Sequence, residues 1–307
     1  MFKVTGQGPR AAEAVALQRP VPSIPSRVGG GLWTFARRKP LGAICAVILA
    51  VFVLTSAFAT VVAPHDPLKQ NGGRTIEGSS REFWMGTDHL GRDIFSRILY
   101  GAKISITVGI AAVCVGTSMG STLGLISGYR GGKLDLYIQR LVDAWIAFPG
   151  LILTLTLVSM LGASLINVCI AIGIASIPGT SRLVRSTVLA VKQNDFILAA
   201  RALGAGDPRI VIRHVLPNVM APIIIAGTVS LGGAILAEST LSFLGMGVPP
   251  PAPTWGGMLS REGREFMLIQ PGLALWPGFA ITSVVMAFNL FGDALRDVWD
   301  PRLRGSK

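Results

Sequence analysis

KISITVGIAAVCVGTSMGSTLGLISG, residues 103–128, is the stretch that decides the fold. After its first lysine it carries no charged residue, and it is long enough to cross a bilayer as one helix. Glycines recur in it at every fourth position, which places them on one helix face: Gly116, Gly120, Gly124 and Gly128. A face of small residues lets another backbone approach closely. We therefore expect this helix to be buried in protein, against another helix of this chain or against a second subunit.

The composition of the whole chain supports a membrane protein. Half of its 307 residues are hydrophobic and 14% are charged, whereas soluble domains carry about a quarter charged residues. The net charge of +12 is typical of the positive-inside bias of membrane proteins. Because no basic stripe interleaved with aromatic residues occurs, we expect no nucleic-acid partner. The three cysteines, Cys45, Cys114 and Cys169, lie inside apolar runs and indicate neither disulfides nor a metal site.

Six apolar segments predict an all-α, polytopic fold with six transmembrane helices. We expect them at residues 41–63, 103–128, 137–161, 165–181, 219–244 and 272–292. The first is interpreted as a retained signal anchor, because the tail of residues 1–40 is too long for an ordinary signal peptide. Twenty of the 28 lysine and arginine residues lie in the two tails (1–40 and 293–307) and in the turns on their side. This bias predicts that both termini lie in the cytoplasm.

Two external loops follow from this arrangement. In residues 64–102 the side chains of one helical face are apolar: Leu90, Ile94, Phe95, Ile98 and Leu99. They predict an amphipathic helix on the outer membrane surface, with Asp93 and Arg97 paired on its other face. The loop 245–271 begins with a stiff, proline-rich segment ending in Trp255. This segment either contacts a substrate-delivering protein or closes the outer mouth.

Two acidic residues fall in or near predicted spans. Glu238 lies within the fifth span, and Asp143 lies near the start of the third. An ionisable group at membrane depth suggests a functional site. The alternative is a structural hydrogen bond to a neighbouring helix, and Arg140 or Arg185 could pair with Asp143.

The segment 194–217 predicts a helical element between the fourth and fifth spans. Asn194 is a candidate N-cap, the apolar residues Phe196, Ile197, Ala200 and Leu203 form one face, and Gly204 ends the helix. Asp207 and Pro208 start a second helix as N-cap and N1, and it runs to Pro217. We therefore expect two short helices hinged at Gly204, with small residues that let another protein sit close to the backbone.

The spacing of this segment resembles the "EAA" signature of permease subunits of bacterial ABC importers. The matching residues are Leu198, Ala199, Ala200, Gly204, Ala205, His214, Leu216 and Pro217. Leu198 stands where the family pattern has glutamate, so we expect an apolar contact there. Further motifs, among them FWMGTDHLGRDIFSR at residues 83–97 and NLFGD at 289–293, resemble the second permease of the dipeptide/oligopeptide/nickel group.

This resemblance implies a type I ABC importer permease with its core at residues 103–292, in the inner membrane of a bacterium. The segment 194–217 would then be the coupling loop that docks on an ATPase. The implied partners are a second permease, two cytoplasmic ATP-binding subunits, an external substrate-binding protein and membrane lipid. The implied solute is a peptide or a related small solute such as glutathione or nickel.

Other function classes lack their sequence signatures. Gly131-Gly132-Lys133 is followed by Leu134, so no phosphate-binding loop is present and we expect no ATP, cofactor or metal in this chain. No His-Glu-x-x-His or Gly-x-Ser-x-Gly motif indicates a membrane enzyme, and we expect no catalytic residue. A secondary transporter or channel remains the alternative, but it would be favoured by charged residues in several spans.

Overall fold

The computed structural model describes residues 36–37 and 39–299. Residues 1–40 and 41–307 form two separate units, and the architecture below is that of the second. Nearly all of the predicted N-terminal tail, and residues 300–307 of the predicted C-terminal tail, lie outside the described residues.

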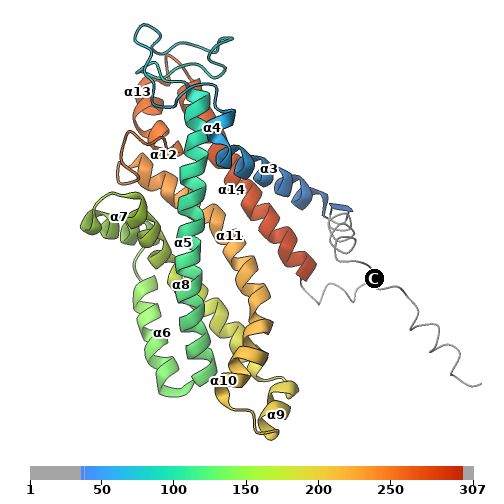
Figure 1. Ribbon diagram of the computed structural model, residues 1–307. Coiled ribbons are helices and arrows are strands. Elements are labelled where there is room, and N and C mark those ends of the chain that lie inside the picture. Colours follow the sequence, from blue (N-terminus) through green and yellow to red (C-terminus); the bar gives the residue numbers. More distant parts are fainter. Residues whose placement is uncertain (1–35, 38, 300–307) are drawn as a thin grey trace, which may run out of the picture. The chain divides into compact units, whose positions relative to one another are not determined.

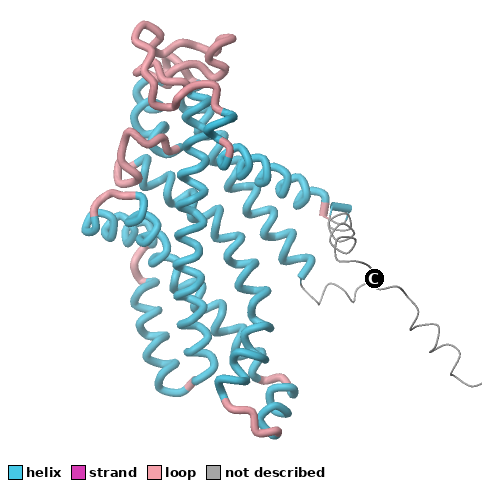
Figure 2. The backbone as a smooth tube through the Cα atoms, viewed as in Figure 1, coloured by secondary structure: helices cyan, strands magenta, loops and turns pink. Residues whose placement is uncertain are grey.

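The described part of the chain consists of helices and loops without a strand (Figures 1 and 2). In chain order the helices are α3 (Pro40–Ala57), α4 (Ala59–Val62), α5 (Ile94–Arg130), α6 (Gly132–Ile146), α7 (Gly150–Leu161), α8 (Leu165–Lys192), α9 (Asp195–Ala202), α10 (Asp207–Ile210), η1 (Val211–Val215), α11 (Leu216–Phe243), α12 (Trp255–Met258), η2 (Leu259–Gly263), α13 (Arg264–Phe266) and α14 (Gly272–Trp299).

Five of these elements are long and apolar enough to cross a membrane, and the bent pair α6–α7 would be a sixth. The five are α3, α5, α8, the continuous run from α10 to α11, and α14. One end of the bundle, which we call the loop end, is formed by residues 64–93 and 245–271 (Figure 1). The opposite end is formed by α9 and α10, and we call it the α9 end. The all-α, polytopic prediction is confirmed.

The glycine face of α5 packs against α8 of the same chain. A Cβ added at Gly120 would lie 2.8 Å from the carbonyl oxygen of Ile177, and one at Gly124 would lie 2.5 Å from that of Ser181. Gly116 and Gly128 meet earlier and later turns of α8 in the same order. The two helices therefore run parallel in close contact, and of the two alternatives the one within this chain is correct.

The third predicted span is wrong as a single helix. The axes of α6 and α7 differ by 88° across the residues between them. Pro149 stands at the N-cap of α7; it has no N–H group and keeps Phe148 out of the helical conformation. The chain therefore turns here and returns through α8 to the α9 end (Figure 1).

The predicted amphipathic surface helix is also wrong. Helix α5 begins at Ile94 and continues without a break to Arg130, so this segment is the first part of the membrane-crossing helix. Ile94, Ile98 and Leu99 are buried. Ile94 and Ile98 pack in one core cluster with residues of α3, α11, α12 and α14, so their apolar face contacts protein and not a membrane surface.

The first predicted span, 41–63, is divided at Phe58 into α3 and α4, and two other spans extend beyond their predicted ends. Helix α8 continues to Lys192 and α14 to Trp299. Three proline residues lie inside these long helices without ending them: Pro178, Pro222 and Pro277. Neighbouring groups in a membrane bundle can satisfy the carbonyl that a proline leaves free.

We predict that Gly120→Ala destabilises the bundle. The new methyl group would lie 2.7 Å from Thr180 Cβ and 2.8 Å from the carbonyl oxygen of Ile177, and overpacking of this kind costs about 1–3 kcal/mol. Thermal unfolding of the purified chain, followed by tryptophan fluorescence, should show a lower Tm.

The matched control is Gly179→Ala on the exposed side of α8, where an added Cβ meets nothing within 4 Å. It should leave the Tm unchanged or raise it, because alanine favours helix over glycine. Equal shifts for the two variants would contradict the packing described here.

Candidate functional site

Helix α9 ends in a compact turn at the α9 end of the bundle. Gly204 has φ of +80°, a conformation that glycine adopts at little cost. Its N–H donates to the carbonyl of Arg201 at 2.9 Å, and the N–H of Ala205 donates to the carbonyl of Ala200 at 3.0 Å. These two bonds are the Schellman pattern. The prediction that Gly204 ends the helix is confirmed.

Asn194 has a different role from the one predicted. Its backbone is extended at the N-cap of α9, but its side chain makes no capping hydrogen bond there. Instead the amide nitrogen Nδ2 donates to the carbonyl of Val191 at 3.0 Å. Asn194 therefore satisfies the C-terminus of α8, and the step from α8 into α9 takes only Gln193 and Asn194.

The second helix is not short, which corrects the prediction of two short helices. Helix α10 begins at Asp207 after an N-cap at Gly206. A π-helical turn, η1, then carries the chain directly into α11. The N–H of Leu216 donates to the carbonyl of Val211, one residue further back than in an α-helix.

Pro217 continues this helix, whereas we predicted that the helix runs only to this residue. It lies in the first turn of α11, and because α11 continues η1, its missing N–H leaves a carbonyl of the preceding turn without its intrahelical donor. The Asn218 side chain donates to the carbonyl of His214 at 2.6 Å. The helix is not ended by the proline, so α10 and the membrane-crossing α11 form one continuous element.

The side chains of α9 divide into an inward and an outward side. Ile197 and Ala200 are buried and pack with residues of α5, α8, α10 and α11. Leu198 is 57% exposed and Leu203 is 89% exposed. The predicted single apolar face is therefore wrong, because Leu203 and Phe196 are exposed while Ile197 and Ala200 face the chain's own core.

The residues that match the "EAA" signature are also divided between exposed and buried positions. Leu198, Ala199, Gly204 and Pro217 are exposed, whereas Ala200 is buried and Ala205, His214 and Leu216 are half-buried. Leu198 and Ala199, with Ala202 one turn further along, lie on the outward side of α9. We call these three residues and Leu203 the α9 tip. It is a small, apolar surface that another protein could approach closely.

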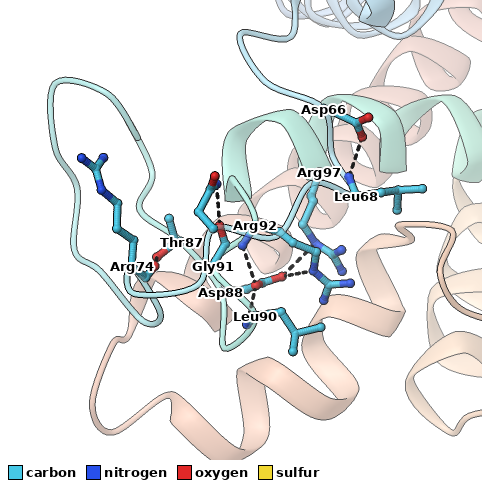
Figure 3. A network of polar contacts seen from close by, with 10 residues as sticks. Asp66, Leu68, Arg74, Thr87, Asp88, Leu90, Gly91, Arg92 and Arg97 are labelled. Carbon is cyan, nitrogen blue, oxygen red and sulfur yellow. Dashed lines mark hydrogen bonds and ion pairs between the residues drawn. The ribbon is translucent and has the colours of Figure 1, made fainter.

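At the loop end, a buried carboxylate organises the start of α5 (Figure 3). Asp88 accepts from Arg92 Nε at 2.6 Å, and Arg97 Nε lies 3.5 Å from the same oxygen. Its other oxygen accepts from the backbone N–H groups of Leu90 and Arg92. The charges of these arginines are therefore balanced within the protein and not by solvent.

Asp93, in the same loop, is the N-cap residue of α5. Its side chain accepts from Ser96 N at 3.0 Å and Ser96 Oγ at 2.6 Å. The prediction placed Asp93 and Arg97 on an exposed face, but both are buried.

At the surface of the same loop, the hydrogen bond and the negative charge of Glu82 raise the pKa of the Arg74 guanidinium.

The proline-rich loop does not present its aromatic residue to a partner. Trp255 is fully buried and donates from Nε1 to the carbonyl of Ile98 at 3.0 Å. Phe52 of α3 contacts it edge-on, with ring centroids 6.0 Å apart. The Trp255 side chain thus joins α12 to α3 and α5, so a contact between it and a substrate-delivering protein is ruled out.

The two intramembrane acids both have partners. Glu238 is fully buried and accepts from Ser105 of α5 and from Ser242, each at 2.8 Å. Asp143 pairs with Arg182 at 2.5 Å, whereas Arg185, one of the two arginines that we considered, pairs with Asp135. For Glu238, the alternative of a structural hydrogen bond between helices is the one observed.

The sequence of this chain matches a known family over the part that contains α9, α10 and the proline-rich loop. Residues 120–305 match the model of the family described as "Binding-protein-dependent transport system inner membrane component". The chain belongs to this family.

Curated relatives agree with the family over most of the chain. A dipeptide transport system permease protein of Alkalihalophilus pseudofirmus is 43% identical over 268 residues, 87% of this chain and 88% of the relative. Glutathione transport system permease proteins of Escherichia coli and Shigella boydii are 42% identical over 274 residues, 89% of this chain and 90% of each relative.

Family membership sets the general role of the chain. As an inner-membrane component of a binding-protein-dependent transport system, it is a multi-pass transport permease and not an enzyme. Such a permease works with a binding protein and with ATPase subunits. The resemblance to ABC importer permeases is confirmed.

Several polar contacts at the α9 end were not predicted from the sequence. Arg185 of α8 forms two hydrogen bonds of 2.6 Å to Asp135 of α6, and Ser127 of α5 contacts the same carboxylate. Tyr129 of α5 contacts Asp207 of α10. The pairs Arg185–Asp135 and Tyr129–Asp207 join residues far apart in sequence, and only the polarity of Tyr129 and Asp135 beside an apolar run could have drawn attention to them.

We predict that Gly204→Ala loosens the α9 tip. Alanine is strained at a φ of +80°, by about 1–2 kcal/mol, although an added Cβ would meet nothing within 4 Å. Amide hydrogen exchange, measured by mass spectrometry, should become several-fold faster in the peptide that covers residues 200–206.

Gly206→Ala serves as the control two residues away, because Gly206 has an ordinary φ of −71° and its nearest contact would be Pro208 Cδ at 4.0 Å. If the two alanine variants exchange at equal rates, the left-handed turn at Gly204 does not hold the tip.

Proposed function

We propose that this chain is the second permease subunit of an ATP-driven importer of short peptides, and that the α9 tip is where an ATPase subunit docks. The observation that carries this proposal is an exposed apolar surface on an element tightly joined to the membrane helices. Leu203 is 89% exposed, yet the helix it follows is closed by two hydrogen bonds and anchored by Ile197 in the core.

Two features make α9 suitable for transmitting force. The chain passes from α8 into α9 within two residues, and α10 is continuous with α11 through η1. A push on α9 is therefore delivered to two membrane-crossing helices and is not absorbed by a flexible loop. Docked ATPase subunits could then shift these helices between states open to opposite sides of the membrane.

The orientation and the partners follow from the same assignment. We place the α9 end and both termini in the cytoplasm, since 20 of 28 basic residues lie on that side. Two ATPase subunits, a second permease and an external binding protein complete the proposed complex. Membrane lipid would cover the exposed apolar side of α3, where Leu41, Val47 and Leu54 are each more than half exposed.

The contact with the ATPase would be apolar at position 198. Leu198 replaces the glutamate of the family pattern and is exposed on the outward side of α9. Because an apolar side chain cannot form an ionic contact, the proposed docking relies on burial of Leu198 and Leu203 with close approach at Ala199 and Ala202.

The proposed substrate class rests on the relatives. The relatives compared above are named for the transport of dipeptides or of glutathione, which are both short peptides. Short peptides are therefore the class that we propose, and the binding protein would select among them.

The test is co-purification of the complex with Leu203→Asp. Burying an unpaired carboxylate in an apolar contact is strongly unfavourable, so the variant should insert into the membrane normally but retain much less ATPase. Transport of a labelled dipeptide into vesicles should fall in parallel.

Leu268→Asp is the matched control, since Leu268 is 91% exposed but lies at the loop end. It should retain the ATPase subunits in full. The docking proposal is wrong if Leu203→Asp binds the ATPase and transports like the unmodified protein.

A further inference from the structure

Tyr129 lies where the cytoplasmic ends of several helices meet under our proposed orientation. It is the penultimate residue of α5 and is 6% exposed. Its ring belongs to the apolar cluster that also contains Val188 of α8, Ile197 of α9 and Ile210 of α10. A tyrosine buried among apolar residues usually directs its hydroxyl group to a partner.

The hydroxyl group of Tyr129 joins α5 to α10. It donates to Asp207 Oδ1 at 2.6 Å, across 78 positions of sequence. Arg201 of α9 interacts with the same tyrosine side chain. Through the bond to Asp207 the end of α5 is in polar contact with α10.

A second contact joins Tyr129 to α8. Lys192, the last residue of α8, donates from Nζ to the backbone carbonyl of Tyr129 at 2.6 Å. The same ammonium lies 5.5 Å from the centre of the Tyr129 ring, within the range of a cation–π interaction. Both contacts are independent of the tyrosine hydroxyl group.

Helix α5 has no direct chain connection to α9 and α10, which form the proposed docking element. Helices α8 and α11 adjoin this element through the chain itself. Helix α5 ends at Arg130, more than sixty positions before α9, so motion of α9–α10 reaches it through side-chain contacts with them or through its packing on α8. Burial of the Tyr129 ring provides packing, and the bond to Asp207 adds a directional contact that fixes the position of α10 along α5.

We propose that Tyr129 is a positioning residue that couples displacement of α9–α10 to α5 through its hydrogen bond to Asp207. This inference rests on the proposed docking of an ATPase at the α9 tip. Through the glycine contact between α5 and α8 described above, a displacement that enters at Tyr129 is carried along the length of both helices toward the loop end.

The experiment compares Tyr129→Phe with the unmodified protein in the complete complex, reconstituted in vesicles with its ATPases and binding protein. Phenylalanine keeps the ring, its packing and both lysine contacts, and removes the hydroxyl group. Peptide transported per ATP hydrolysed should fall roughly fivefold, while ATPase co-purification stays unchanged.

Variants of Asp207 separate the hydrogen bond from other effects. Asp207→Ala should reproduce the loss of coupling, and Asp207→Asn should retain most of it, because an amide oxygen still accepts from the tyrosine. The double variant of Tyr129→Phe and Asp207→Ala should be no worse than either single variant. Tyr100→Phe, a change of the same kind near the opposite end of α5, is the control and should have normal coupling.

Two results would overturn the inference. One is unchanged transport per ATP in Tyr129→Phe; the other is loss of the ATPase from that variant, which would make Tyr129 part of folding or docking. In both cases the proposed function would stand if the unmodified complex retains its ATPase and Leu203→Asp loses it. If the unmodified chain binds no ATPase, the proposed function itself fails.

Discussion

The close packing of α5 on α8 is the contact on which the other elements depend. Four glycines at four-residue spacing bring the two backbones together over residues 116–128 of α5 and 173–188 of α8, and no larger side chain fits there without movement. Because the helices run parallel, α6 and α7 must return the chain between them. The arrangement of the bundle follows from a face of residues that have no side chains.

This contact also relates the two functional ends of the molecule. At the loop end, α5 starts in a network of buried charges around Asp88 and Asp93 and is held by Trp255. At the α9 end, α5 stops beside α10 and α8 leads into α9. A tightly packed pair of helices transmits displacement better than a loosely packed one, because its backbones cannot approach further. Helices α5 and α8 therefore suit a permease that must move in response to an ATPase.

Sequence reasoning identified most of the spans, the glycine face and the turn at Gly204, since each depends on local spacing. It misplaced the start of α5, because Asp93 and Arg97 were interpreted as a pair on the outer face of a surface helix, whereas both are buried and Arg97 lies beside Asp88. Pro149 ends a helix whereas Pro178 does not, and nothing local distinguishes them. The contacts of Tyr129 and Glu238 span 78 and 133 positions, so they became visible only in the folded chain.

Photo-crosslinking from position 203 is the most direct test of the central claim, that this permease meets its ATPase through the α9 tip. A benzophenone amino acid would replace Leu203 in the assembled complex in native membranes, with a second protein carrying the same group at Leu268 for comparison. We expect irradiation to link position 203 to an ATPase subunit and to leave position 268 unlinked to it. An ATPase linked to position 268, or to neither position in a complex that still transports, would contradict the claim.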